Sequence, residues 1–139
     1  MQATAEVRVL AQPQKPYVET RFDPDPGIYW GYMTPRPRAC FTKELLIELR
    51  GFVDSIVNCS GRLPGFESTP IRYAVIASKY PGAFSLGGDL ELFRAAIMRG
   101  DREQLLNYGR HCIDNLFPWH RNCDLPLTTI SLVQGDALG

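Results

Sequence analysis

The sequence has 139 residues, of which 45% are hydrophobic and 22% are charged, with 15 basic and 15 acidic side chains. This length and composition predict one domain with a buried core. The balanced charge argues against nucleic acid as a partner, because domains that bind it are usually strongly basic. No apolar run approaches the ~20 residues of a membrane span, and the N-terminal residues lack the pattern of a secretory signal. We therefore expect a cytoplasmic protein without a membrane partner.

The first forty residues favour extended structure. Segments 7–10, 17–22 and 27–33 are rich in β-branched and aromatic residues, which is typical of strands. Proline, aspartate and glycine at residues 23–27 predict a tight corner between the second and third segments. We expect these two strands to form a hairpin or meander.

Helices and strands alternate in the rest of the chain. Thr42 opens a predicted helix whose apolar residues fall on one face, and Gly61 is a plausible stop. Residues 71–77 are apolar enough for a strand buried on both sides, as in a parallel sheet. A short helix over residues 90–98 ends at Gly100, and a last strand covers residues 127–133. This order is an α/β pattern.

Between the two later strands, Asp101 and Gln104 have the spacing of a capping box and start another helix. Its predicted apolar stripe comprises Leu105, Tyr108, Cys112 and Leu116. Pro118 is expected to limit the helix.

A glycine-containing segment, residues 84–90, joins the buried strand to the short helix. Gly87 and Gly88 allow close approach of a ligand to the backbone, and the start of a helix offers unpaired N–H groups and a positive dipole end. Residues 133–139 form a second glycine-containing segment after the last strand. Two such loops can direct two backbone donors at one oxygen, which is the geometry of an oxyanion hole. In isolation, the first segment would equally suit an ordinary strand-to-helix turn.

Charged residues near this segment have simpler interpretations. Asp89 is expected to cap the short helix and Glu91 to support its first turn, rather than to act as acid or base. Asp136 could face either solvent or a ligand. The basic cluster at residues 36–38 could be a solvated turn or a contact for a ligand phosphate.

Histidine and cysteine residues do not predict a metal site. His111, Cys112, His120 and Cys123 match none of the usual zinc spacings, and Cys112 lies on an apolar stripe. The four cysteines form no C-x-x-C pair, so we expect reduced thiols. Trp30, Trp119 and their tyrosine neighbours are expected to be core or interface aromatics rather than a stacking platform.

The chain resembles the crotonase, or enoyl-CoA hydratase/isomerase, superfamily over about residues 27–139, with residues 1–26 as an extended lead-in. Residues 85–89 match the first oxyanion-hole signature of that superfamily, small-x-Gly-x-Asp. Residues 133–139 match the start of the second, Asn/Gln-Gly-x-Ala-x-Gly-Gly-Gly, and residues 36–41 match an Arg-Pro-x-Ala segment. Residues 38–41, 86–93, 100–106 and 132–135 look closer to one branch, the diffusible signal factor synthases.

The resemblance implies an α/β fold, namely the N-terminal half of a crotonase-like spiral of ββα units. It assigns the Leu86 N–H as one oxyanion donor, with Gly87 and Gly88 giving the thioester room and Asp89 fixing the helix start. Arg38 and Ala39 would line the path of coenzyme A or carrier-protein phosphopantetheine. The second donor would be a glycine just beyond Gly139, followed by two catalytic glutamates. We therefore expect the chain to be part of a longer enzyme.

The activity implied is enolate-stabilised addition or removal of water on an acyl thioester, without a metal or redox cofactor. In the signal-synthase branch, a 3-hydroxyacyl carrier protein would be dehydrated and a cis-2-unsaturated fatty acid released. The alternatives are an ordinary enoyl-CoA hydratase/isomerase and a non-catalytic acyl- or protein-binding module. The resemblance also implies a homotrimer or hexamer, and the branch suggests a receiver or PAS-type sensor domain as a partner.

Overall fold

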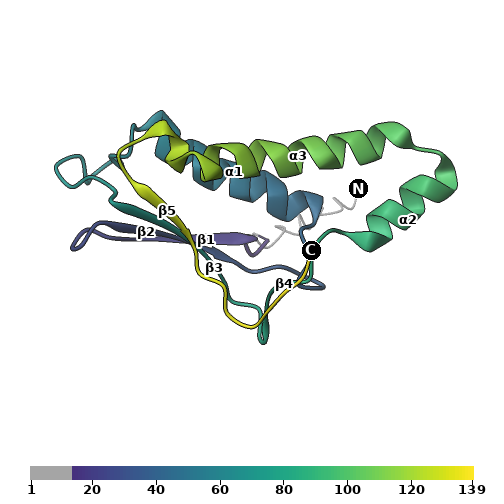
Figure 1. Ribbon diagram of the computed structural model, residues 1–139. Coiled ribbons are helices and arrows are strands. Elements are labelled where there is room, and N and C mark those ends of the chain that lie inside the picture. The colour runs from purple at the N-terminus through teal and green to yellow at the C-terminus, as the bar shows by residue number, and fades with distance from the viewer. Residues whose placement is uncertain (1–13) are drawn as a thin grey trace, which may run out of the picture.

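A four-stranded sheet forms the base of the molecule (Figure 1). The computed structural model describes residues 14–139, so the strand predicted at residues 7–10 lies outside the described residues. The strands of the sheet, in spatial order, are β1 (Val18–Asp23), β2 (Ile28–Met33), β3 (Tyr73–Ser78) and β5 (Thr128–Ser131). β1 and β2 form the predicted antiparallel hairpin, and β3 pairs in parallel with both β2 and β5. The predicted parallel arrangement of the later strands is confirmed.

The helix α1 (Lys43–Asn58) covers one face of this sheet and supplies five of the twelve residues of the hydrophobic core cluster. It begins where predicted, because the Thr42 side chain accepts a hydrogen bond from the Leu45 amide at 3.2 Å. Its buried residues recur at helical spacing: Leu45, Leu46, Leu49, Phe52, Val53 and Ile56. The ring of Phe52 lies over Gly31 of β2, where an added Cβ would be 3.1 Å from the ring carbons. The absence of a side chain on β2 therefore lets α1 approach the sheet closely.

Two further helices, α2 (Leu90–Arg99) and α3 (Arg102–His120), follow the glycine segment. Gly100 ends α2 in the left-handed conformation, with φ of 65°, and Asp101 caps α3 by accepting from the Gln104 amide at 3.1 Å. The reciprocal half of the predicted capping box is absent among the described contacts of residues 14–139, because the Gln104 side chain accepts from Arg99 instead. α2 and α3 thus start and stop close to their predicted limits.

Pro118 lies inside α3 and does not end it, contrary to the prediction. A proline lacks the N–H that would bind the carbonyl four residues earlier, which here belongs to Asp114. The Arg50 guanidinium of α1 donates to that carbonyl at 2.5 Å. The helix continues to His120 because a side chain from α1 replaces the missing partner.

Residues of the two glycine segments form a second, two-stranded parallel sheet that the sequence did not predict. Its strands are β4 (Ala83–Ser85) and β6 (Asp136–Ala137). Each has at most three residues, too few for a periodic pattern to be visible. A short 3-10 turn, η1 (Asn122–Asp124), joins α3 to β5.

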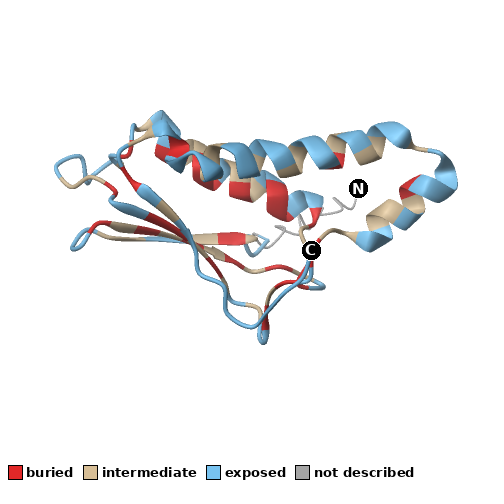
Figure 2. Cartoon of the chain, viewed as in Figure 1, coloured by how far each residue is buried: buried red, intermediate tan, exposed pale blue. Residues whose placement is uncertain are grey.

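The apolar stripe predicted on α3 is mostly uncovered in this structure (Figure 2). Tyr108 is the only one of its four residues that is buried, and Leu116 is 61% exposed. The four residues lie on α3 as predicted, but most of this stripe is not covered by the described residues. Within residues 14–139 no helix combines the length and the apolar character needed to cross a bilayer.

Candidate functional site

The two glycine segments lie side by side, as the sequence predicted. The Leu138 amide donates to the carbonyl of Ser85 at 2.9 Å, and the Asp136 amide donates to the carbonyl of Gly82 at 3.0 Å. The strands that precede the segments, β3 and β5, are parallel neighbours in the main sheet, so both segments leave the same edge. The C-terminus consequently lies close to the start of α2 (Figure 1).

Gly87 makes room for this contact rather than for a ligand. It has φ of 94°, and a Cβ added to it would lie 3.1 Å from the Leu138 carbonyl oxygen and 3.3 Å from the Gly139 carbonyl carbon. Its N–H donates to the Ser85 hydroxyl at 3.0 Å, and its own carbonyl accepts from the Phe41 amide at 2.9 Å. Gly87 therefore allows the close approach of the second glycine segment, and its predicted contact with a thioester stays a prediction.

The Leu86 amide is not free to bind a ligand. It donates to the carbonyl oxygen of Ala39 at 2.6 Å, which ties the glycine segment to the loop before α1. The prediction that this N–H is an oxyanion donor is thus contradicted by its existing hydrogen bond. Ala39 does not fit its predicted contact with substrate in this structure. It is 1% exposed, and its carbonyl already accepts from the Leu86 amide.

Gly88 carries the amide that remains available. No acceptor for its N–H is found among residues 14–139, whereas the amides of Leu86, Gly87 and Asp89 all have partners. The peptide unit that carries this N–H also contains the Gly87 carbonyl, which Phe41 holds. Because a trans peptide is planar, fixing the carbonyl also fixes the direction of the N–H. Gly88 therefore presents a fixed, unpaired donor at the N-terminal end of α2.

A pocket of about 280 Å³ lies at this donor. Its lining residues are Arg38, Cys40, Leu86, Gly88, Leu90 and Glu91. Gly88 is half-buried and the Leu86 and Leu90 side chains are exposed, so the pocket has apolar walls and an open mouth. Burial raises the pKa of the Cys40 thiol, which keeps it in the neutral form.

Charged groups at the pocket are already paired with one another. The Asp89 carboxylate caps α2, as predicted, by accepting from the Leu92 amide at 3.2 Å. The Arg38 guanidinium lies 2.5 Å from the Glu91 carboxylate and 3.8 Å from that of Asp89. The hydrogen bond from Arg38 lowers the pKa of Glu91 and the same pair raises the pKa of Arg38. Two carboxylates thus offset the single cation at the pocket.

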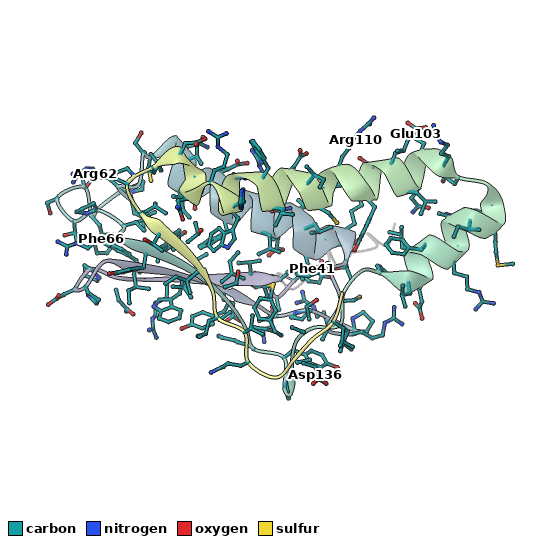
Figure 3. The ribbon with its side chains drawn as sticks, in the orientation of Figure 1. Phe41, Arg62, Phe66, Glu103, Arg110 and Asp136 are labelled. Carbon is teal, nitrogen blue, oxygen red and sulfur yellow. The ribbon has the colours of Figure 1, made fainter. Side chains whose placement is uncertain are left out.

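Arg36, the other basic residue of the cluster at residues 36–38, binds backbone carbonyls and an aromatic ring of the chain itself. Its guanidinium donates to the carbonyls of Pro16 and Thr34 at 3.3 and 3.2 Å and lies 3.8 Å from the centre of the Tyr17 ring. It therefore fastens the start of β1 to the end of β2. Asp136, whose orientation the sequence left open, is exposed to solvent (Figure 3).

Sequence reasoning missed two residues that shape the site, Phe41 and Tyr108. Figure 3 shows Phe41 near the N-terminal end of α1, and its backbone forms an isolated parallel bridge with Gly88. The Tyr108 hydroxyl of α3 donates to the Phe41 carbonyl at 2.5 Å and accepts from the Asp89 amide at 3.1 Å. The only signal in the sequence was a hydroxyl-bearing residue on an otherwise apolar stripe.

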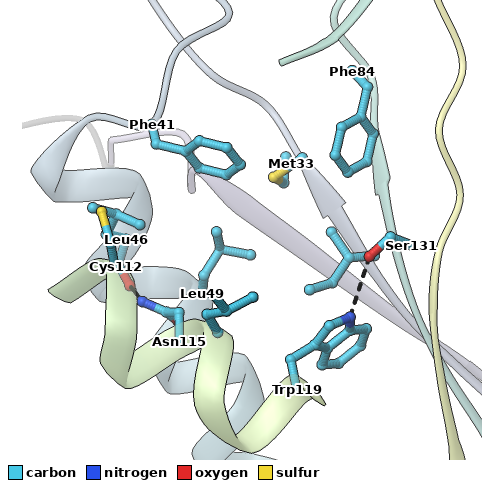
Figure 4. Close-up of a pocket in the computed structure, with 11 residues that line it drawn as sticks. Met33, Phe41, Leu46, Leu49, Phe84, Cys112, Asn115, Trp119 and Ser131 are labelled. Atoms are coloured by element: carbon cyan, nitrogen blue, oxygen red, sulfur yellow. Dashed lines mark hydrogen bonds between the residues drawn. The ribbon is translucent and has the colours of Figure 1, made fainter. Parts of the chain in front are cut away.

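A separate apolar cavity of about 230 Å³ lies between α1, α3 and the sheet (Figure 4). It is lined by side chains that include Phe41, Leu49 and Phe84, and by Trp119, whose indole N–H donates to the Ser131 hydroxyl at 3.2 Å. The Asn115 side-chain amide donates to the carbonyls of Leu46 and His111 at 3.0 and 2.8 Å. Phe41 thus contributes its ring to this cavity and its backbone to the glycine segment.

Metal-ligating side chains do not cluster in the described part of the chain: residues 14–139 contain no group of three or more that could hold an ion. The four cysteines are free thiols.

Comparison with solved structures shows similarity in fold at low sequence identity. The chain superposes on Pseudomonas aeruginosa DspI with a TM-score of 0.65 and 16% identity, covering 94% of this chain and 43% of that one. A putative enoyl-CoA hydratase from Streptomyces coelicolor A3(2) superposes with a TM-score of 0.60 and 16% identity, covering 96% of this chain and 44% of that one. An enoyl-CoA hydratase from Geobacillus kaustophilus HTA426 superposes with a TM-score of 0.61 and 20% identity, covering 88% of this chain and 40% of that one. No protein-family model and no curated protein matches the sequence.

The chain spans less than half the length of each of these three proteins. The shared part has the mixed α/β architecture that the sequence predicted, with a parallel sheet edge from which both glycine segments emerge. The chain therefore has the crotonase fold and represents its N-terminal half.

Proposed function

We propose that this chain provides the thioester-binding half of an enzyme of the enoyl-CoA hydratase/isomerase type, with the Gly88 N–H as a donor to the thioester carbonyl oxygen. The observation that carries the proposal is the unpaired Gly88 amide, held rigidly at the start of α2 and exposed to a pocket. When a proton leaves the carbon next to a thioester, negative charge develops on the carbonyl oxygen. A fixed amide and the positive end of a helix stabilise that charge most where it is greatest, in the transition state.

The second glycine segment supports the same role. The Leu138 amide donates to the Ser85 carbonyl at 2.9 Å, and a Cβ added to Gly87 would lie 3.3 Å from the Gly139 carbonyl carbon. The second segment thus runs beside the residue that precedes the free amide, where a second backbone donor could reach the same oxygen. The resemblance implies a glycine amide just beyond Gly139 as that donor.

Arg38 and Glu91 suggest how the rest of the ligand binds. Because Asp89 and Glu91 offset the charge of Arg38, the pocket rim favours a neutral, hydrogen-bonding chain over a bare phosphate. The pantetheine arm of coenzyme A or of a carrier protein is such a chain. Glu91 is unsuited to act as a general acid, because its partner Arg38 lowers its pKa and favours the ionised form.

The finer proposal is a diffusible signal factor synthase. A 3-hydroxyacyl carrier protein would lose water to give a cis-2-enoyl thioester, and hydrolysis of that thioester by water would release the free acid and the carrier thiol. To test this, the full-length protein is incubated with 3-hydroxyacyl carrier protein and, separately, with crotonyl-CoA. Free unsaturated acid from the first and little hydration of the second supports the synthase.

The opposite pattern would instead support an ordinary hydratase. Binding of both substrates without turnover of either would support the non-catalytic acyl-binding alternative. The synthase proposal is rejected by either of these two results.

The donor itself is tested by nuclear magnetic resonance with acetoacetyl-CoA, a thioester that forms a stable enolate. We expect the Gly88 amide proton to move downfield on binding, while the Leu86 amide, already bonded to Ala39, stays nearly unchanged. Leu86 is thus the matched control within the same spectrum. If only the Leu86 amide proton shifts, or if neither amide proton shifts, the assignment of Gly88 as the donor is contradicted.

A further inference from the structure

Tyr108 is the one buried residue of α3, and it lies 19 positions after Asp89 in the chain. Its side chain is 5% exposed, and its hydroxyl lies between two backbone groups of different segments. One is the Phe41 carbonyl, which accepts from the hydroxyl at 2.5 Å, and the other is the Asp89 amide, which donates to it at 3.1 Å. A buried tyrosine normally needs one partner for its hydroxyl, and this one joins two.

The hydroxyl braces a backbone bridge. Phe41 and Gly88 form an isolated parallel bridge, in which the Phe41 amide donates to the Gly87 carbonyl at 2.9 Å. In such a bridge the Asp89 amide faces the Phe41 carbonyl. The Tyr108 hydroxyl bonds both of these groups and so ties the two segments together on either side of Gly88.

Both peptide units that flank the Gly88 Cα are therefore fixed by distant residues. Phe41 holds the Gly87 carbonyl on one side, and Tyr108 holds the Asp89 amide on the other. The Phe93 ring packs edge-on against Tyr108, with centroids 5.0 Å apart, and lies 3.0 Å from where a Gly88 Cβ would be. Gly88 thus packs against an aromatic pair, and its N–H is the one unpaired amide among residues 86–89.

We infer that Tyr108 is a positioning residue for the Gly88 donor, so that α3 controls the direction of the N–H that receives the thioester oxygen. This inference rests on the function proposed above. Without the hydroxyl, the Asp89 amide and the Phe41 carbonyl lose the partner that they share, and the Gly88 peptide units are held less firmly. Burial raises the pKa of Tyr108 to about 12, so the hydroxyl stays protonated over the range in which most enzymes act.

The test removes only the hydroxyl, with the substitution Tyr108→Phe in the full-length protein. We expect kcat with the preferred thioester to fall about 10- to 100-fold, because a small misplacement of a fixed donor has effects of that size. KM should change little, since pocket contacts elsewhere are retained. The downfield shift of the Gly88 amide on binding acetoacetyl-CoA should shrink in the same variant.

Tyr29→Phe is the matched control. Tyr29 is also buried, and its hydroxyl lies 3.3 Å from the Ser55 hydroxyl in the core between α1 and β2. Its loss should leave kcat and the Gly88 shift unchanged, even if stability falls as much as in Tyr108→Phe. Equal loss of kcat in both variants would mean that the effect of Tyr108 is merely structural, and would overturn the inference.

Failure of the two proposals can be told apart. Wild-type protein that neither turns over thioesters nor shifts the Gly88 amide rejects the proposed function and, with it, this inference. Wild-type activity with an unchanged kcat in Tyr108→Phe rejects the positioning role alone. If Tyr108→Phe does not fold, Phe93→Leu decides, because it keeps the Tyr108 hydroxyl and removes the ring that packs against it. We expect an unchanged kcat and an unchanged Gly88 shift in this variant, and a loss of kcat of about 10- to 100-fold would overturn the inference.

Discussion

The two helical regions of the molecule differ in what their buried residues do. α1 buries six apolar side chains against the sheet, whereas α3, although longer, buries Tyr108 alone (Figure 2). The burial of α1 drives folding through removal of apolar area from water. The single buried side chain of α3 instead bonds two backbone groups, the Asp89 amide of the glycine segment and the Phe41 carbonyl of the loop before α1. One helix stabilises the fold, and the other orients the site.

The exposed side of α3 fits this division. Its uncovered apolar residues include Ile113, Leu116 and Phe117. The solved structures that share the fold are more than twice as long as this chain. Large exposed apolar residues that lie close together usually mark an interface.

The largest contrast should come from truncating the same residue type on both helices. Ile56 of α1 is fully buried, and Ile56→Ala should lower the free energy of unfolding by about 2–5 kcal/mol through lost burial and a cavity. Ile113 of α3 is 60% exposed, and Ile113→Ala should change it by no more than about 0.5 kcal/mol in this chain. Urea unfolding of residues 1–139 measures both. Equal losses would mean that α3 contributes to the core as much as α1 does.

Two glycines test the contact between the glycine segments, because Gly135 lies at this contact and Gly65 lies away from it. Gly135 and Gly65 both have positive φ, 75° and 83°, so alanine at either incurs a conformational cost of about 1–2 kcal/mol. A Cβ on Gly135 would also lie 2.3 Å from the Gly82 carbonyl oxygen, while one on Gly65 meets nothing within 4 Å. The free energy of unfolding should therefore fall by roughly 1–3 kcal/mol more in Gly135→Ala than in Gly65→Ala, which a lower melting temperature would show. Similar melting temperatures for the two variants would be evidence against the pairing of β4 with β6.

A smaller effect is expected at the cap of α3. Asp101→Ala removes the acceptor for the Gln104 amide and should lower the free energy of unfolding by about 1 kcal/mol. Asp101→Asn keeps an equivalent acceptor and should be nearly neutral. Hydrogen exchange of the first-turn amides of α3 gives the local readout. A loss in the asparagine variant as large as in alanine would indicate that charge, and not the cap, is responsible.

The smallest effect concerns the exposed pair at the pocket. Arg38→Met should raise the pKa of Glu91 towards its ordinary value, because the hydrogen bond from Arg38 is the main cause of its depression. A depressed carboxylate pKa stabilises the folded state above the ordinary pKa of glutamate, and this contribution is lost as pH falls through the folded-state value. Since both side chains are exposed, no measurable change in unfolding is expected.

Titration of the side-chain carboxyl by nuclear magnetic resonance follows the pKa of Glu91 directly. Glu19, whose pKa is lowered by Lys79, serves as the control and should be unaffected by Arg38→Met. An unchanged Glu91 would show that the ion pair does not form in solution.

The sequence by itself determined the elements and their order. Thr42 and Asp89 cap the helices they were expected to cap, the corner before β2 makes a hairpin, and both glycine segments leave one sheet edge. These features depend on local propensities and on apolar periodicity, which neighbouring residues specify. The two-residue β6 and the continuation of α3 past Pro118 were missed because partners far away in the chain create them.

Only the tertiary structure decided which amide of the glycine segment is free. Leu86 and Gly88 carry identical N–H groups, and nothing local distinguishes them as donors. The carbonyl of Ala39 and the hydroxyls of Ser85 and Tyr108 accept from the amides of Leu86, Gly87 and Asp89, so that of the four amides from Leu86 to Asp89 the one of Gly88 is left unpaired. A hydrogen-bond vacancy is a property of what surrounds a group, so it arises only when α1, α3 and the glycine segment pack together.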